Sequence, residues 1–142
     1  MWILLLNPNT SASVTALMAE RADDMAGAAA TFVPVTARFG AAYIASRTTL
    51  AIASHAALDA VAEHGSDCEA VLLACFGDLS LLVLREIAPA PVVGMLEASC
   101  LEAQRTASRY AIVTKGSPVE ADPCRHSRRY GSRRWPRGHP DD

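Results

Sequence analysis

Short apolar runs alternate along the chain with longer stretches that are rich in alanine and in polar residues. The apolar runs have the length of strands, whereas the stretches between them contain few Gly or Pro residues and have the length of helices. Strands that alternate with helices are typical of βαβ units, so the pattern predicts an α/β fold with a parallel sheet. We expect five strands, at 2–6, 31–36, 69–75, 91–95 and 109–114. The first helix should begin at a cap within 10–13 and end at about 26, and three more helices should follow at 48–64, 79–88 and 97–107.

Two of these strands should occupy different places in the sheet. Pro34 cannot donate a backbone hydrogen bond, which places its strand at a sheet edge. The run from Glu69 to Cys75 is almost continuously apolar, as expected for a central strand that is covered on both faces. A parallel sheet binds its ligand beyond the carboxyl ends of the strands, and the loops at that edge are 7–10, 75–78, 94–97 and 114–116.

Composition and charge narrow the class of partner. The chain has 142 residues, of which 51% are hydrophobic, and this is enough for one globular domain. Residues 1–120 carry 7 Lys and Arg against 12 Asp and Glu, so the body of the chain is acidic and offers no basic face for nucleic acid or for an anionic membrane. No apolar run is long enough to span a bilayer. We therefore expect a small-molecule partner, with no nucleic acid and no membrane.

The character of the sequence changes after Gly116. Arginine, proline and histidine replace the aliphatic residues, and residues 121–142 carry 6 Lys and Arg against 3 Asp and Glu. Three interpretations of this basic tail stay open: an arm that binds nucleic acid, a disordered segment, or translation of a GC-rich gene out of frame. We favour the third.

The first residues lack the positive leader of a secretory signal, which predicts a cytoplasmic protein. In that reducing compartment cysteines should be free thiols, and the chain has four of them, Cys68, Cys75, Cys100 and Cys124. They show no C-x-x-C pair and no spacing typical of zinc. His55 has Asp59 one helical turn later but no further ligand pair, so we expect no metal site.

Cys75 is the strongest candidate for catalysis. It stands where a buried strand ends and a helix is about to begin, and there free N–H groups and the helix dipole should lower the thiol pKa from about 8.5 toward about 7. Such a thiol can take up or return a proton at neutral pH. The alternative is a buried structural cysteine. Gly77 favours chemistry because it permits a tight turn beside a bound oxyanion, and Asp78 can cap the next helix.

Two further loops carry polar side chains at strand ends. The turn from Asn7 to Thr10 lies next to a helix N-terminus, and its side chains could donate hydrogen bonds to a carboxylate or an imide carbonyl. Alternatively, these residues form only a turn and a helix cap. Thr114 ends the expected fifth strand in the same manner, and its alternative is an ordinary strand-to-loop turn.

Four segments taken together closely resemble the hydantoin racemases of the aspartate/glutamate racemase superfamily. They are 3–11 (ILLLNPNTS), 74–78 (ACFGD), 91–94 (PVVG) with Glu97 and Ala98, and 110–114 (YAIVT). A strand followed by NPNTS and later by CFGD is specific to this group in that order and spacing. The resemblance covers about 1–116 and only the N-terminal half of such an enzyme, and the similar allantoin racemases stay open as an alternative.

The resemblance implies a cofactor-independent isomerase with two pseudo-symmetric α/β lobes, each a flavodoxin-like parallel-sheet lobe. One cysteine from each lobe faces the chiral carbon of the substrate, so that one thiolate removes the proton and the other thiol returns one. The matching residues of this chain are Cys75 for the first-lobe cysteine, Asn7 and Thr10 for the substrate-side loop, Phe76 and Gly77 for the pocket, and Thr114 for the loop that opens the second lobe.

The sequence departs from the family where the second cysteine should stand. Cys124 lies between Pro123 and Arg125 and lacks the glycines that the family places around that cysteine. The resemblance therefore implies a first lobe with the first strand of the second over 1–116, an aberrant tail over 117–142, and a chain that is truncated and inactive. A non-catalytic α/β domain that binds a small anion is the main alternative, and a homo-oligomer is compatible with both.

Overall fold

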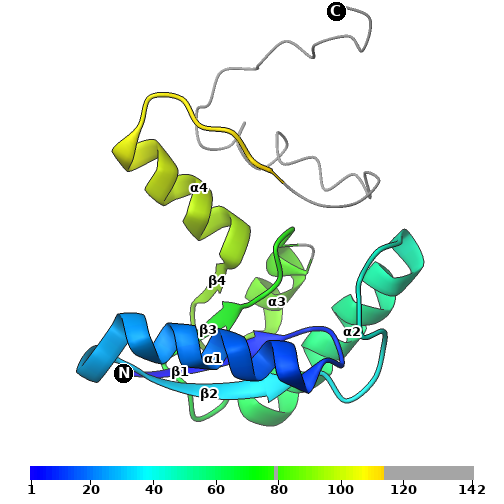
Figure 1. Ribbon diagram of the computed structural model, residues 1–142. Helices are drawn as coiled ribbons and strands as arrows, with labels where there is room; N and C mark the ends of the chain where they lie inside the picture. Colours follow the sequence, from blue (N-terminus) through cyan, green and yellow to red (C-terminus); the bar gives the residue numbers. More distant parts are fainter. Residues whose placement is uncertain (79, 114–142) are drawn as a thin grey trace, which may run out of the picture.

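The computed structural model describes residues 1–78 and 80–113, in which four parallel strands form one sheet (Figure 1). The strands are β1 (Trp2–Asn7), β2 (Thr31–Thr36), β3 (Ala70–Leu73) and β4 (Val92–Gly94). They lie in the order β2-β1-β3-β4, and every neighbouring pair runs parallel. This is the order of a flavodoxin-like sheet, so the predicted α/β class with a parallel sheet is confirmed.

Helices connect the strands and cover both faces of the sheet. α1 (Ala12–Ala26) is followed by the short 3-10 helix η1 (Gly27–Ala29), and then come α2 (Arg47–His64), α3 (Leu81–Ile87) and α4 (Met95–Thr106). α1 packs against β1 and β2 on the face nearest the viewer in Figure 1, whereas α2 and α3 lie behind the sheet. None of the helices in the described part of the chain is long and apolar enough to cross a membrane.

The places of two strands follow from their sequences. β2 lies at the edge of the sheet, as Pro34 predicts, because an edge tolerates a residue without an N–H. β3 lies between β1 and β4, which confirms the central position expected for the apolar run before Cys75. The strand is shorter than predicted, since it ends at Leu73 and leaves Cys75 in the loop that follows.

The hydrophobic core lies between the sheet and the pair α2 and α3. Leu4 and Leu6 point to this side because the side chains of a strand alternate between its faces. Ala57 and Ala60 meet them from α2, and small side chains let a helix backbone approach a sheet closely. The other buried members of this core are Val61, Val71, Leu73, Leu81, Leu84 and Val92.

The fifth strand predicted at 109–114 is wrong for the residues that the structure describes. Residues 109–113 have no strand conformation, and Thr114 lies outside the described residues. A strand forms only where a neighbour takes up its backbone hydrogen bonds. The sheet of the described residues ends at β2 and β4, and 109–113 pairs with neither of them.

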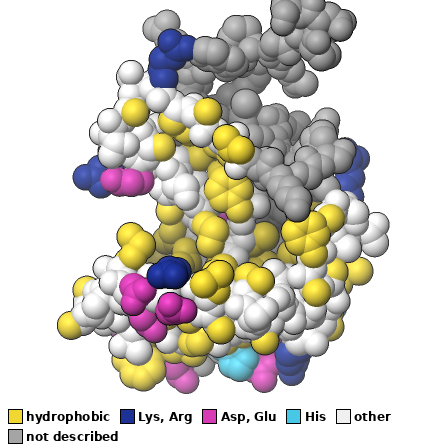
Figure 2. All heavy atoms as spheres, in the orientation of Figure 1, with side chains coloured by type: hydrophobic (Ala, Val, Ile, Leu, Met, Phe, Trp, Pro, Cys, Tyr) yellow, Lys and Arg dark blue, Asp and Glu magenta, His cyan; other side chains and the backbone are white. Residues whose placement is uncertain are grey.

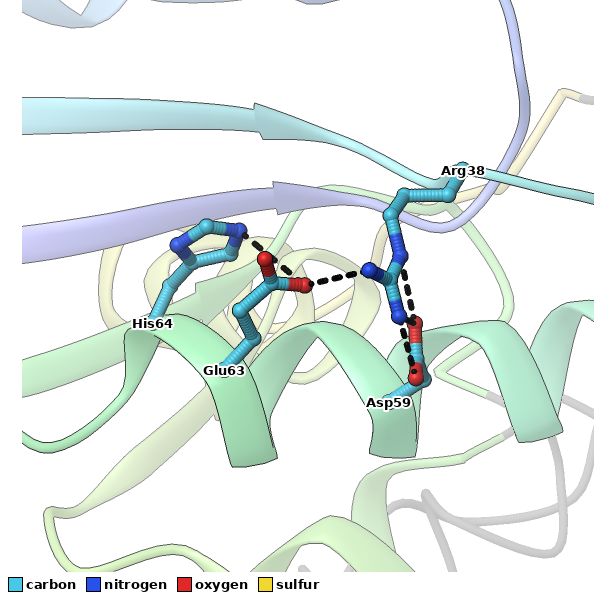
Figure 3. Close-up of polar contacts among 4 residues, drawn as sticks. All are labelled: Arg38, Asp59, Glu63 and His64. Atoms are coloured by element: carbon cyan, nitrogen blue, oxygen red, sulfur yellow. Dashed lines mark hydrogen bonds and ion pairs between the residues drawn. The ribbon is translucent and has the colours of Figure 1, made fainter.

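Charged side chains tie the loop after β2 to α2 (Figure 3). The Arg38 guanidinium donates to both carboxylate oxygens of Asp59, at 2.8 Å each from one nitrogen, and its other terminal nitrogen lies 3.0 Å from Glu63. His55 packs its ring edge-on against Phe39. Asp59 thus pairs with Arg38, whereas the ring of His55, one helical turn earlier, contacts Phe39. These groups are largely exposed, so they stabilise the fold much less than the core does.

The face drawn in Figure 2 is hollowed between α1 and α4, and hydrophobic side chains gather there. The elements that border this recess carry large apolar residues that are exposed, among them Leu17 of α1, Val93 of β4 and Leu101 of α4. Soluble monomeric domains rarely expose a large contiguous patch of apolar side chains.

Two leucines of α3 provide a test of the core. Leu84 is 0% exposed and Leu82 is 50% exposed. We expect Leu84→Ala to lower the free energy of unfolding by about 2–5 kcal/mol, because the change removes buried methyl groups and leaves a cavity. The control Leu82→Ala, on the same helix, should change it by less than about 1 kcal/mol. Urea denaturation followed by circular dichroism measures both, and equal effects would contradict the assigned core.

Candidate functional site

The carboxyl ends of β1 and β3 lie side by side. Leu6 is level with Leu73, and the N–H of Ala74 donates to the carbonyl of Leu6 at 2.8 Å. The loop that follows Asn7 at the end of β1 therefore lies next to the loop that contains Cys75 after β3. The structure brings together the two motifs that the sequence placed at strand ends, at the edge where parallel sheets bind ligands.

Asn7 is 0% exposed, and its side chain points into its own loop. The amide nitrogen donates to Asn9 Oδ1 at 3.0 Å and to Thr15 Oγ1 at 3.0 Å, and it lies 3.3 Å from the carbonyl of Ser11. The amide oxygen accepts the Asn9 N–H at 3.2 Å. These bonds fasten the loop to the first turn of α1. Asn7 therefore shapes the loop, and a direct contact with substrate stays a prediction.

Thr10 joins this loop to the segment after β2. Its N–H donates to the carbonyl of Ala41 at 3.1 Å, and its side chain is partly buried. Ser11, the N-cap residue of α1, makes no side-chain cap hydrogen bond, and its hydroxyl instead lies 3.2 Å from that of Ser13. The first turn of α1 is thus held by Asn7 and Thr15 more than by a capping serine.

The Cys75 thiol is partly buried, and burial raises its pKa from 9.0 to about 11. The negative charge of Asp78 acts in the same direction. The sequence predicted a lowered pKa, and this prediction is wrong for the described lobe. The expected helix dipole is absent at the thiol because α3 begins only at Leu81. At neutral pH the thiol is therefore protonated.

The turn after Cys75 has an unusual backbone. Gly77 has φ of 138° and Asp78 has φ of 49°, the one positive φ at a non-glycine residue in the part of the chain that the structure describes. Gly77 is buried, whereas Phe76 is 47% exposed and its ring is available at the surface. The predicted tight turn at Gly77 is present.

Asp78 caps a different helix from the one expected. Its carboxylate accepts the N–H of Leu96 at 3.1 Å and that of Glu97 at 2.6 Å, in the first turn of α4. The predicted capping of the helix directly after Asp78 is wrong, because Asp78 contributes its backbone carbonyl to Leu81 and directs its side chain across to α4. The N-cap residue of α4 is Gly94, which has no side chain to cap its own helix, so the capping oxygen comes from Asp78.

A second buried contact that the sequence did not reveal fixes the start of α4. The Arg85 guanidinium forms an ion pair with the carboxylate of Glu97, and its Nε donates to the carbonyl of Val92 at 3.0 Å. Glu97 is buried, so its charge requires such a partner. The contact joins α3, β4 and α4.

Comparison with known proteins shows the family of this chain. The family model Asp/Glu/Hydantoin racemase matches residues 3–131. The chain belongs to this family. The match continues past residue 116, where the resemblance carried by the sequence motifs ended. The interpretation of 117–142 as an aberrant tail concerns residues that lie outside the described ones.

Two relatives are named hydantoin racemase. The one from Paenarthrobacter aurescens is 30% identical over 116 residues and the one from Pseudomonas sp. (strain NS671) is 32% identical over 117 residues. The chain covers 49% and 46% of their lengths, so it spans about half of the relatives that it matches. The resemblance of the sequence to the hydantoin racemases is confirmed, over about half of their length.

Two solved structures that are similar to this lobe are allantoin racemases. The enzyme from Pseudomonas fluorescens has a TM-score of 0.79 at 30% identity, and that from Klebsiella pneumoniae has 0.81 at 32% identity. The chain covers 54% and 53% of these structures. The fold is therefore one lobe of the Asp/Glu racemase type, in a family whose named members here are isomerases.

The acidity of Cys75 is directly measurable. We expect its rate of alkylation by iodoacetamide to rise with a midpoint at about pH 11, because burial disfavours the thiolate. Peptide mapping by mass spectrometry separates Cys75 from the other cysteines. The denatured chain is the control, in which the midpoint should return to about 8.5. A midpoint of the folded chain at or below that of the denatured chain would contradict the burial of the thiol.

Proposed function

We propose that this chain is the first lobe of a racemase of 5-substituted hydantoins or related amino-acid derivatives, with Cys75 as the residue that exchanges the proton at the chiral carbon. One observation carries the proposal: in a chain of the racemase family, Cys75 follows the central strand β3 beside the loop of Asn7. The substrate would lie at this carboxyl edge of the sheet.

The reaction requires two proton carriers on opposite sides of the substrate. A thiolate takes the proton from the chiral carbon, and the negative charge passes into the neighbouring carbonyl. A thiol on the opposite face then returns a proton to that carbon, so no proton is gained or lost overall. With a pKa of about 11, Cys75 in the described lobe is suited to return a proton. To remove a proton from the substrate, Cys75 must become a thiolate, so its pKa must fall. We propose that groups beyond this lobe lower it.

The other residues of the proposed site have different parts. Asn7 acts through the loop that it shapes, and Thr10 lies at the outer side of that loop. Phe76 offers an exposed ring to the side chain of a substrate, and Gly77 allows the turn that presents it. Thr114, which we propose for the loop that opens the second lobe, lies outside the described residues.

Allantoin is the second candidate substrate. The relatives found by sequence are named hydantoin racemases, whereas the solved structures are named allantoin racemases, and the identities are equally high in both groups. Both substrates contain a hydantoin ring and differ in the group on its chiral carbon. An assay with allantoin and with a 5-alkyl hydantoin side by side decides between them.

The chain by itself is proposed to be inactive, as the sequence suggested. The two other described cysteines are poorly placed as the second proton carrier. Cys68 precedes β3 and so lies at the amino end of the strands, opposite to Cys75. Cys100 lies along α4, which rises away from the sheet in Figure 1. The gene sequence beyond codon 116, translated in three frames, tests whether another frame encodes a second lobe. The cytoplasmic location, the independence of cofactors and an oligomeric state stay predictions.

The 142-residue chain should show no racemisation. We expect one enantiomer of a 5-substituted hydantoin, incubated with the chain in D2O, to keep its configuration to the same extent as in a blank without protein. Polarimetry and mass spectrometry follow configuration and deuterium uptake. Racemisation above the blank would contradict the assumed need for a second lobe. Deuterium uptake with retained configuration would mean that Cys75 works alone on one face, and binding without exchange would favour the non-catalytic anion-binding alternative.

In a version of the protein that carries a second lobe, Cys75→Ser should lower kcat at least about 100-fold, because a serine hydroxyl is too weak an acid to replace the thiol. Substrate binding should persist. Cys68→Ala is the matched control and should keep near-normal turnover, since Cys68 lies at the other end of β3. Turnover by the Cys75→Ser variant close to that of the control would end the case for Cys75.

A further inference from the structure

We infer that Asp78 is a positioning residue for Cys75, because it clamps the turn that carries the cysteine to the first turn of α4. Both oxygens of its carboxylate are used, one by the N–H of Leu96 at 3.1 Å and one by the N–H of Glu97 at 2.6 Å. Asp78 is only 2% exposed. The inference rests on the proposed function in one respect, since a positioning role matters only if Cys75 does the chemistry.

The backbone of the turn shows why it needs a clamp. Gly77 and Asp78 both have positive φ, at 138° and 49°. Glycine accepts such a conformation without strain, whereas aspartate adopts it at a cost in free energy. Strained residues persist where the surrounding contacts over-determine them, and they gather at functional sites. At Asp78 the two charge-assisted hydrogen bonds to α4 are those contacts.

Gly94 makes the clamp fit. A Cβ atom at this position would lie 2.4 Å from Cγ and from Oδ2 of Asp78, which is closer than two such atoms can approach. Gly94 is the N-cap residue of α4, a place where Ser, Thr, Asp or Asn usually supplies the capping oxygen. The missing side chain of Gly94 leaves room for the carboxylate of Asp78, which caps the helix in its place.

The clamp connects the cysteine to a rigid support. The Glu97 backbone N–H bonds to Asp78, while the Glu97 side chain forms its ion pair with Arg85 of α3. Arg85 also donates to the carbonyl of Val92 in β4. The turn of Cys75 is thus fixed directly to α4, and α4 is tied in turn to α3 and β4. Because Glu97 takes part through two separate groups, its side chain can be changed without removing the bond to Asp78.

The charge of Asp78 also acts on the cysteine that it positions. Its carboxylate disfavours the Cys75 thiolate, in addition to the larger effect of burial. One residue thus influences both where the thiol lies and how readily it loses its proton. A purely structural cap would affect only the stability of α4.

The first test is Asp78→Asn in the 142-residue chain. Asparagine keeps the size but loses the charge, and it has an oxygen at only one of the two positions where the carboxylate accepts an N–H. We expect Cys75 to be alkylated at least about threefold faster at pH 9, because the fraction of thiolate rises as the pKa falls. Hydrogen exchange at the amides of Leu96 and Glu97 should rise at least about tenfold, since these amides lose protection.

Gly94→Ala tests the same clamp without changing a charge. The added methyl group should push the Asp78 carboxylate from its place, so the amides of Leu96 and Glu97 should again exchange faster and the alkylation profile of Cys75 should shift. Glu97→Gln is the matched control, because it removes the ion pair with Arg85 but keeps the backbone N–H that Asp78 binds. This control should lower stability and leave the alkylation midpoint of Cys75 unchanged.

The inference is overturned if Asp78→Asn and Gly94→Ala both leave the Cys75 midpoint and the exchange of these two amides as they are. It is also overturned if Glu97→Gln shifts the midpoint as far as Asp78→Asn does. Should a variant unfold, the unmodified chain still tests the clamp. Its Leu96 and Glu97 amides must exchange at least about tenfold more slowly than unstructured amides, and faster exchange would overturn the inference. None of these measurements depends on racemisation, so a failure of the proposed function would be seen separately.

Discussion

The parallel pairing of β1 with β3 is the contact on which the rest of the molecule depends. β1 has a hydrogen-bonded neighbour on each side, and its residues from Leu4 to Asn7 are buried. Since parallel strands end at the same edge of a sheet, this pairing alone brings the loop of Asn7 next to the loop of Cys75, although 68 positions separate them in the sequence. The core formed with α2 and α3 holds the pair in register, because a slip by one residue would turn Leu4 and Leu6 away from the helices.

The two loops at this edge are built in opposite ways. The loop after β1 is internally satisfied, with the buried Asn7 amide bonded to Asn9 and Thr15. The turn after β3 depends on a distant segment, because Asp78 finds its hydrogen-bond donors in α4. The first loop is therefore shaped mainly by hydrogen bonds within its own segment, and the Thr10 N–H ties it to Ala41 in the segment after β2. The cysteine turn keeps its shape only while β4 and α4 stay in place, which makes the position of the thiol sensitive to what happens beyond β4.

The high pKa of the Cys75 thiol is consistent with a lobe that covers about half of its relatives. In the described residues the thiol is partly buried beside a carboxylate, and both conditions favour the neutral form. A base that removes a proton from carbon needs the opposite, namely hydrogen-bond donors or a positive charge near the sulfur. In the proposed reaction this lobe would supply one of the two cysteines, and groups outside the lobe would have to lower the pKa of its thiol.

The sequence alone determined the features that depend on local pattern. Apolar runs of strand length gave the four strands, the lack of an N–H on Pro34 gave the edge position of β2, and the NPNTS and CFGD motifs gave the family. Tertiary structure decided every feature that joins distant segments. Only the fold could show that Asp78 caps α4, that Arg85 neutralises the buried Glu97, and that burial raises the Cys75 pKa. The residues at 109–113 failed as a strand for the same reason, because an apolar run becomes a strand only when a partner accepts its hydrogen bonds.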